Sequence, residues 1–334
     1  MSEIARQQPG LSAPRVPIGR LLLNYALQYG IYLVFIVLCV GVAIASPVFL
    51  TARNLNNILL QTSAVGIVAV GMTFVIIARG IDVSVGAIVA LASAVAVTAI
   101  KLNGAAWWVG LLLMFAVALV VGVVNGFSSA YLFMPPFLVT LATLTVGRGL
   151  VLAISQGTNY WGLPSFYENL GLGTLGPIPI PVIIMLVSFL VGHLLLKHTV
   201  FGRQVYAVGG NPEAARVSGI NVERITMLTF VIVGLFSGLS CLVLTSRLNS
   251  FTPSMGTGFE FAAIAAVVIG GTSLMGGEGN IGGTLIGVLI MGVINNALNL
   301  LGVSVYYQDV IRGGIIFLAV MIDALRNRYA QAID

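Results

Sequence analysis

The sequence contains very little charge. Aspartate, glutamate, lysine and arginine together make up 7% of the 334 residues, whereas about a quarter is usual in a soluble domain. Apolar residues make up 58%, and the mean hydropathy is +1.06. Because the polar side chains are too few to cover a water-exposed surface, and because long apolar runs are typical of spanning helices, we predict an all-α membrane protein with many spans.

Cysteine, histidine and lysine are also scarce, with two residues of each. Cys39 and Cys241 both lie in apolar runs, which excludes a disulfide framework or a cysteine metal site. The two histidines have no further ligands nearby, so no metal is expected. Neither lysine follows a glycine, so the chain has no P-loop. No catalytic set of residues is present either. We therefore expect no catalytic residue and no cofactor in this chain, and any ATP and Mg²⁺ would be bound by a partner subunit.

Positive charges exceed negative ones, giving a net charge of +5. In a membrane protein this excess is explained by topology rather than by nucleic-acid binding, so no nucleic-acid partner is expected. If the N-terminus is cytoplasmic, ten of the 15 lysines and arginines fall on the inner side. The positive-inside rule therefore predicts that both termini are cytoplasmic.

Three regions are predicted along the chain. Residues 1–27 form a cytoplasmic arm that ends in an interfacial helix, residues 28–325 form the transmembrane domain, and residues 326–334 form a cytoplasmic tail. A span needs about 20 mostly apolar residues, and on this basis about ten spans are expected. They lie near residues 31–45, 62–79, 84–100, 105–124, 136–154, 178–196, 225–245, 260–275, 282–301 and 306–324.

The apolar stretch from Gly71 to Leu91, GMTFVIIARGIDVSVGAIVAL, is interrupted by charge and glycine in its centre. This pattern predicts a broken membrane helix near residues 79–84, and a second glycine-rich break is expected near residues 271–282. Broken helices frame substrate sites in many transporters, and an intramembrane acid such as Asp82 is a functional-site hypothesis. Asp82 has two structural alternatives: it pairs with Arg79, or it caps the following helix.

The longest predicted cytoplasmic loop spans residues 197–224. Asn211 is placed to cap a short helix that Pro212 begins, with Glu213 near the positive end of the helix dipole. Such a helix between membrane spans is suited to dock a partner. The alternative is a solvated connector without a partner.

Four blocks of the sequence together resemble one known family. They are GMTFVIIARGIDVSVGA, FGRQVYAVGGNPEAARVSGINVERI, FAAIAAVVIGGTSLMGGEGNIGGTLIG and NNALNLLGVSVYYQDVIRGG. In this order and spacing they are similar to the permease subunit of bacterial ABC importers for monosaccharides, of the ribose, xylose, arabinose and galactose type. The resemblance covers about residues 45–325.

The resemblance implies a multi-pass protein of the bacterial inner membrane with three protein partners. These are a cytoplasmic ABC ATPase that binds ATP and Mg²⁺, a periplasmic sugar-binding protein, and a second permease, either identical or different. The segment from Glu213 to Gly219 is similar to the EAA loop through which importer permeases engage their ATPase. The expected coupling residues are therefore Asn211, Glu213, Ala214, Ala215, Arg216 and Gly219.

A sugar that crosses the membrane must exchange water for other hydrogen bonds, so polar side chains are expected along an otherwise apolar passage. The alternative role of such asparagines and threonines is hydrogen bonding between helices. The predicted path residues are Asp82, Ser84, Asn125, Phe137, Thr140, Thr143, Asn295 and Asn299.

Other functions remain open at this point. A branched-chain amino-acid ABC permease would share the architecture, although the GIDVSVG and GGTSLMGG blocks favour a sugar permease. An ion-coupled secondary transporter would also have broken helices, with Asp82 as a coupling carboxylate. A membrane scaffold or receptor would transport nothing. The loop at residues 197–224 argues against the last two.

Overall fold

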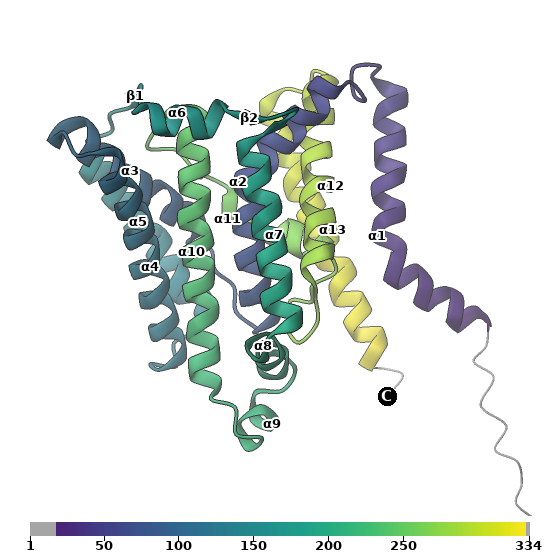
Figure 1. The fold of residues 1–334 in the computed structure, drawn as a ribbon. Coiled ribbons are helices and arrows are strands. Elements are labelled where there is room, and N and C mark those ends of the chain that lie inside the picture. Colours follow the sequence, from purple (N-terminus) through teal and green to yellow (C-terminus); the bar gives the residue numbers. More distant parts are fainter. Residues whose placement is uncertain (1–17, 332–334) are drawn as a thin grey trace, which may run out of the picture.

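The structure is a computed structural model that describes residues 18–331. The chain forms a bundle of helices that run roughly parallel to one another, with short helices at both ends of the bundle (Figure 1). Most of the predicted arm, residues 1–17, lies outside the described residues, and α1 begins at Ile18. The helices are α1 (Ile18–Ala45), α2 (Ala52–Ile77), α3 (Val85–Asn103), α4 (Trp107–Ala130), α5 (Pro136–Ser155), α6 (Ser165–Leu172), α7 (Ile180–His198), α8 (Val200–Gly210), α9 (Pro212–Val217), α10 (Val222–Leu248), α11 (Phe259–Ile269), α12 (Ile281–Leu300) and α13 (Val305–Gln331).

The described strands are two-residue segments that pair in antiparallel fashion at the end of the bundle opposite α9 (Figure 1). β1 (Tyr160–Trp161) pairs with β4 (Ser250–Phe251), and β2 (Thr174–Leu175) pairs with β3 (Ile178–Pro179). The all-α prediction is confirmed, since these pairs only tie loops to the helix ends.

Within the described residues, seven helices are long and apolar enough to cross a membrane: α2, α3, α4, α5, α7, α10 and α12. The predicted count of ten is not confirmed. The predicted span at residues 260–275 is wrong, because α11 contains only 11 residues. At 1.5 Å per residue it extends about 16 Å, roughly half of the hydrocarbon core.

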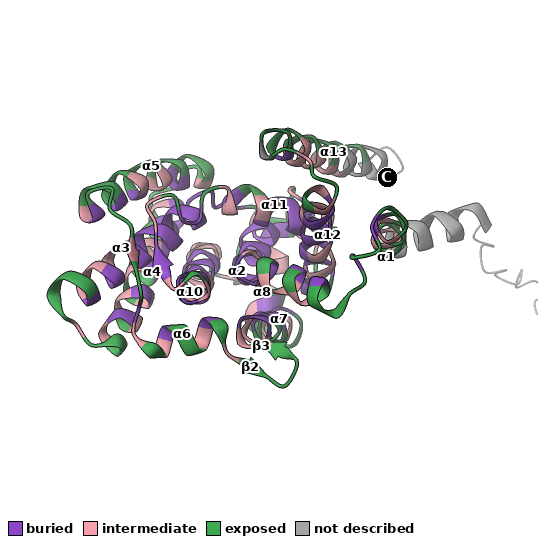
Figure 2. Cartoon of the chain, turned by 90° about the horizontal axis from the view of Figure 1, so that it is seen from above, coloured by how far each residue is buried: buried purple, intermediate pink, exposed green. Residues whose placement is uncertain are grey.

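The centre of the bundle is formed by α2 and α10 (Figure 2). Residues 64–77 of α2 are buried apart from Val65, and this helix is apolar around its whole circumference, as expected of a helix enclosed by others. α4 packs closely on α10 through small residues. A Cβ on Gly122 would lie 2.7 Å from the carbonyl oxygen of Phe230, and one on Gly234 would lie 2.7 Å from that of Ala118. Glycine at these two positions thus allows the helix backbones to pack closely.

Both predicted breaks are present, and they lie against each other. The first separates Ile77 from Val85, and the second separates Ile269 from Ile281. At the α9 end of the bundle, the amide of Gly277 donates a hydrogen bond to the carbonyl of Ile77 (2.9 Å). The two interruptions of the bundle are therefore one connected region, which positions the candidate site.

Candidate functional site

Asp82 lies in the first break with no exposed surface. Its Oδ1 accepts hydrogen bonds from the backbone amide of Ser84 (2.8 Å) and from the Ser84 hydroxyl (2.6 Å). Asp82 therefore shapes the turn that starts α3, whose N-cap residue is Ser84. The alternative pairing of Asp82 with Arg79 is wrong, because the Arg79 guanidinium donates to the carbonyls of Met275 and Gly210. The second carboxylate oxygen of Asp82, Oδ2, is buried without a hydrogen-bond partner among the described residues.

The turn is bonded to two neighbouring helices. The Asn125 amide on α4 donates to the Ser84 hydroxyl (2.9 Å), and the Thr143 hydroxyl on α5 donates to Asn125 Oδ1 (2.6 Å). The Thr140 hydroxyl, also on α5, accepts from the amide of Val83 (3.2 Å). We call this set the break network: Asp82, Ser84, Asn125, Thr140 and Thr143. It contains five of the eight predicted path residues, and their hydrogen bonds run between segments of the bundle.

Burial decides how the break network can act in this conformation. Ser84, Asn125 and Thr140 have no exposed surface, and Thr143 is half-buried. Their polar groups are hydrogen-bonded to one another and to nearby backbone groups rather than offered to a ligand. The interhelical role predicted as an alternative is present, while contact with a sugar remains a prediction.

A pocket of about 300 Å³ lies beside the break network, between α3, α4 and α5. Thr143 is the one side chain in its lining with a hydroxyl, and the other residues are apolar or glycine. Such a lining does not supply the several hydrogen bonds that a sugar requires. Phe137, the aromatic residue among the predicted path residues, is 48% exposed near the start of α5 and is not among the lining residues.

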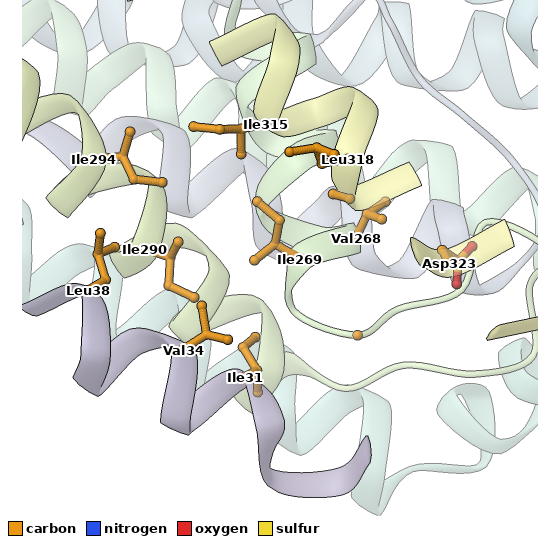
Figure 3. Close-up of a pocket in the computed structure, with 12 residues that line it drawn as sticks. Ile31, Val34, Leu38, Val268, Ile269, Ile290, Ile294, Ile315, Leu318 and Asp323 are labelled. Atoms are coloured by element: carbon orange, nitrogen blue, oxygen red, sulfur yellow. The ribbon is translucent and has the colours of Figure 1, made fainter. Parts of the chain in front are cut away.

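A second pocket of about 360 Å³ lies between α1, α11, α12 and α13 (Figure 3). Its lining is apolar apart from Asp323, whose Oδ2 accepts a hydrogen bond from the amide of Leu274 (3.3 Å). This pocket contains none of the predicted path residues and is also unsuited to a sugar.

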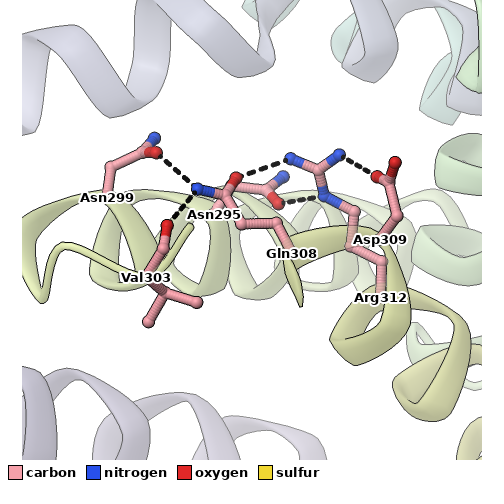
Figure 4. Close-up of polar contacts among 6 residues, drawn as sticks. All are labelled: Asn295, Asn299, Val303, Gln308, Asp309 and Arg312. Carbon is pink, nitrogen blue, oxygen red and sulfur yellow. Dashed lines mark hydrogen bonds and ion pairs between the residues drawn. The ribbon is translucent and has the colours of Figure 1, made fainter. Parts of the chain in front are cut away.

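The remaining path candidates, Asn295 and Asn299, lie on α12 in a separate network (Figure 4). Arg312 of α13 donates through Nε to Asn295 Oδ1 (2.8 Å) and through Nη1 to Asp309 (2.9 Å). Gln308 donates to Asn299 Oδ1 (3.0 Å). The eight candidates thus do not form one site, since two of them instead bind α13 to α12.

Two buried polar residues were not predicted for the path. Glu260 lies in the first turn of α11, is 6% exposed and faces Gly86 of α3. Gln308 is 4% exposed and joins the α12 network. In the sequence, Glu260 directly precedes an apolar run, and this position was the signal that could have identified it. The side chain of Gln308 falls four residues before Arg312, and this spacing places both on one helix face.

The loop predicted to couple the chain to a partner forms α8 and α9. Asn211 Oδ1 accepts from the amide of Ala214 (3.0 Å), so the predicted cap is confirmed. Pro212 occupies the first turn, as expected. α9 projects beyond the ends of α7 and α10 (Figure 1), and Val217 on it is 89% exposed. A short, capped and exposed helix is therefore available to an external partner.

Side chains on α9 are held in defined positions. Arg216 forms ion pairs with Glu213 (3.4 Å) and Glu223 (2.5 Å), and the hydrogen bond to Glu223 raises the pKa of Arg216. Ala215 is 4% exposed and anchors the inner face. Gly219 follows α9 in the left-handed region with φ +82°. It reverses the chain toward α10 in a conformation that favours glycine.

Broken spans, a buried polar network between them and an exposed helix at one end define a membrane protein of the transporter class. A family model described as branched-chain amino acid transport system / permease component matches residues 54–320. The chain belongs to this family of permease components. It is accordingly a multi-pass membrane protein and a transport permease subunit.

Several relatives of the chain are named as sugar permeases. The chain is 46% identical over 302 residues to the ribose import permease protein RbsC of Bacillus subtilis, covering 90% of this chain and 94% of the relative. It is 43% identical over 292 residues to RbsC of Escherichia coli, covering 86% and 91%. It is 40% identical over 304 residues to the L-arabinose ABC transporter permease protein AraH of Azospirillum brasilense, covering 91% and 89%. No solved structure matches the chain. The resemblance to sugar ABC permeases inferred from the sequence is confirmed.

Proposed function

We propose that this chain is the permease of an ABC importer that carries a monosaccharide, and that ribose is the first sugar to test. The observation that supports this most is the 46% identity with a ribose import permease over nearly the full length of both chains. Relatives named for L-arabinose and D-allose are 40% and 38% identical. The chemical class of the substrate is thus better supported than the particular sugar.

In this proposal a separate cytoplasmic ATPase binds ATP and Mg²⁺ and docks on α9, with Asn211, Glu213, Ala214, Ala215, Arg216 and Gly219 at the contact. The exposure of α9 and its capped ends support the assignment. Both chain termini then lie in the cytoplasm. A periplasmic binding protein delivers the sugar to the opposite end, where α6 and the strand pairs lie. A second permease, identical or different, completes the importer.

The break network supplies the polar part of the proposed path. Its hydroxyls and amides bond to one another when the network is closed, which is the arrangement in this structure. Separation of α4 and α5 from the first break would release these groups to a passing sugar. Several weak contacts in sequence suit transport better than one tight site, because the sugar must also leave.

Deleting the gene in its native cell and measuring uptake of labelled sugars tests the proposal. We expect loss of uptake of one monosaccharide, with ribose tested first, followed by L-arabinose, D-allose and D-galactose. Restoring the gene should restore uptake. The melting temperature of the cognate binding protein should rise with the same sugar, because a ligand stabilises the protein that binds it. Loss of leucine uptake with normal uptake of all four sugars would instead identify a branched-chain amino-acid permease.

A further inference from the structure

The C-terminal end of α2 has an unusual residue at its turning point. The amide of Arg79 donates to the carbonyl of Ile76 (3.0 Å), and that of Gly80 donates to the carbonyl of Val75 (2.8 Å). This pair of bonds is the Schellman motif, and its turning residue adopts left-handed backbone angles. Arg79 accordingly has φ +65°. Glycine is the usual residue here, because a Cβ is disfavoured in this region.

Three other helices of the chain have glycine at the turning point of a Schellman motif. α9, α11 and α12 end in the same pair of hydrogen bonds, with Gly219, Gly271 and Gly302 at the turning point and φ values of +82°, +86° and +68°. The α2 terminus therefore differs from these three helix ends, although Gln156 and Asn249 also adopt left-handed angles at the ends of α5 and α10, without this pair of bonds. A residue kept in a disfavoured conformation indicates that its side chain is needed there.

The Arg79 guanidinium joins two segments that are distant in sequence. Its Nε donates to the carbonyl of Met275 (2.8 Å), in the break that follows α11. Its Nη2 donates to the carbonyl of Gly210 (2.7 Å), the last residue of α8. Gly210 directly precedes Asn211, which caps α9. Asp82 of the break network lies only three residues beyond Arg79. One side chain thus connects both breaks with the base of α9.

Small residues allow these segments to approach closely. A Cβ on Gly276 would overlap Cγ of Arg79, and a Cβ on Gly209 would overlap the carbonyl oxygen of Ile77. The Gly277 amide donates to this same Ile77 carbonyl (2.9 Å). The end of α2, the end of α8 and the turn at residues 275–277 therefore meet without intervening side chains. Direct contact between packed segments is a route by which a displacement of one can pass to the others.

We propose that Arg79 is a positioning residue that makes α9 and the two helix breaks move as one unit. Movement of α9 pulls on Gly210, and the guanidinium passes this displacement to the α2–α3 break and to the turn after α11. The break network then opens in step with the ATPase. The inference rests on the proposed function, because it assigns the route by which an ATPase docked on α9 acts on the path.

The test uses the complete transporter in proteoliposomes, with its ATPase and the binding protein loaded with labelled ribose, or with the sugar that the gene deletion identifies. The variants are Arg79→Gly, which removes the guanidinium and suits the backbone, and Arg79→Lys, which retains a charge with less hydrogen-bonding reach. Arg203→Ala is the matched control, because Arg203 is an exposed arginine on α8. The measurements are the melting temperature and the number of sugar molecules transported per ATP hydrolysed.

We expect Arg79→Gly to melt at the same or a higher temperature, because glycine relieves the backbone, yet to transport at least about fivefold less sugar per ATP. Arg79→Lys should recover part of the sugar transported per ATP hydrolysed. Arg203→Ala should transport as much sugar per ATP as the wild type. A wild-type ratio in Arg79→Gly, or an equal loss in Arg203→Ala, would overturn the inference. A lower melting temperature for Arg79→Gly would also overturn it by showing a structural role. If the wild type transports no sugar, the proposed function fails instead.

Discussion

Asn54 of α2 and Asn296 of α12 exchange two hydrogen bonds. The Asn54 amide donates to Asn296 Oδ1 (3.0 Å), and the Asn296 amide donates to Asn54 Oδ1 (2.8 Å). Both side chains are buried, with 6% and 7% exposure. The pair closes the bundle near the start of α2 and the end of α12, whereas the opposite ends of these helices meet at the breaks. The movement proposed at the breaks would therefore occur at the end of these helices opposite the asparagine pair.

Replacing Asn296 by alanine should destabilise the protein. The change leaves part of the buried Asn54 amide unpaired, which costs about 1–3 kcal/mol. Thermal unfolding of the purified protein in lipid nanodiscs measures this loss. Asn103→Ala is the control, since Asn103 is exposed at the end of α3. In the double variant Asn54→Ala with Asn296→Ala, the losses should sum to less than the two single effects, because neither partner is left unpaired. Full additivity would contradict the paired geometry.

Gly86 in the first turn of α3 is a second stability test. A Cβ there would overlap the carbonyl oxygen of Gly256 and Oε2 of Glu260. Gly86→Ala should therefore destabilise the protein by about 1–3 kcal/mol or more, as overpacking does. Gly149→Ala on α5 is the matched control, because a Cβ at Gly149 meets nothing within 4 Å. Equal melting temperatures for the two variants would show that α3 and α11 do not approach as closely as described.

Substitutions of Gly219 test whether α9 couples the permease to its ATPase. Its φ of +82° is tolerated by glycine and asparagine but is strained for a β-branched residue, by about 1–3 kcal/mol. Gly219→Val should largely abolish ATP hydrolysis stimulated by the loaded binding protein, while the permease still accumulates in the membrane. Gly219→Asn should keep most of the stimulation. The ATPase rate of the reconstituted complex is the measurement. Normal stimulation in Gly219→Val would refute coupling through α9.

Substitutions of Asp82 distinguish an ABC importer from an ion-coupled transporter. Only one of its carboxylate oxygens is hydrogen-bonded, and an asparagine can form the same turn with its side-chain oxygen. Asp82→Asn should therefore retain most sugar uptake, whereas Asp82→Ala should lose it with the turn. A coupling carboxylate cannot be replaced by an amide, since it must bind and release a cation. Loss of uptake in Asp82→Asn with an intact fold would favour ion coupling.

Much of the fold could be predicted from the sequence, because the relevant signals are local. Apolar runs predicted the long helices, and the charge and glycine near residue 80 predicted the first break. Asn211 followed by Pro212 gave the start of α9. The span at residues 260–275 was not predicted correctly, because its apolar residues suggest a spanning helix although the segment holds only 16 residues. α11 ends at Ile269, and Gly271 then adopts the left-handed turn of a Schellman motif, with φ +86°.

The site was predicted less completely, because it depends on which helices lie together. The residue types of the break network were identified, but Asn295 and Asn299 were grouped with it although they contact α13. The hydrogen-bond partners of Arg79 were also not predicted. Its nearest acid in sequence is Asp82, whereas its hydrogen-bond partners are backbone carbonyls about 131 and 196 positions away. Backbone acceptors leave no trace in side-chain patterns.

The central claim is that this chain carries a sugar only when a separate ATPase supplies the energy. The most direct measurement is the uptake of labelled ribose, or of the sugar identified by gene deletion, into proteoliposomes containing the permease, its ATPase and the loaded binding protein. The account predicts uptake that requires ATP and the ATPase and that continues when an uncoupler removes the ion gradients. Uptake by the permease alone that collapses with the uncoupler would contradict it.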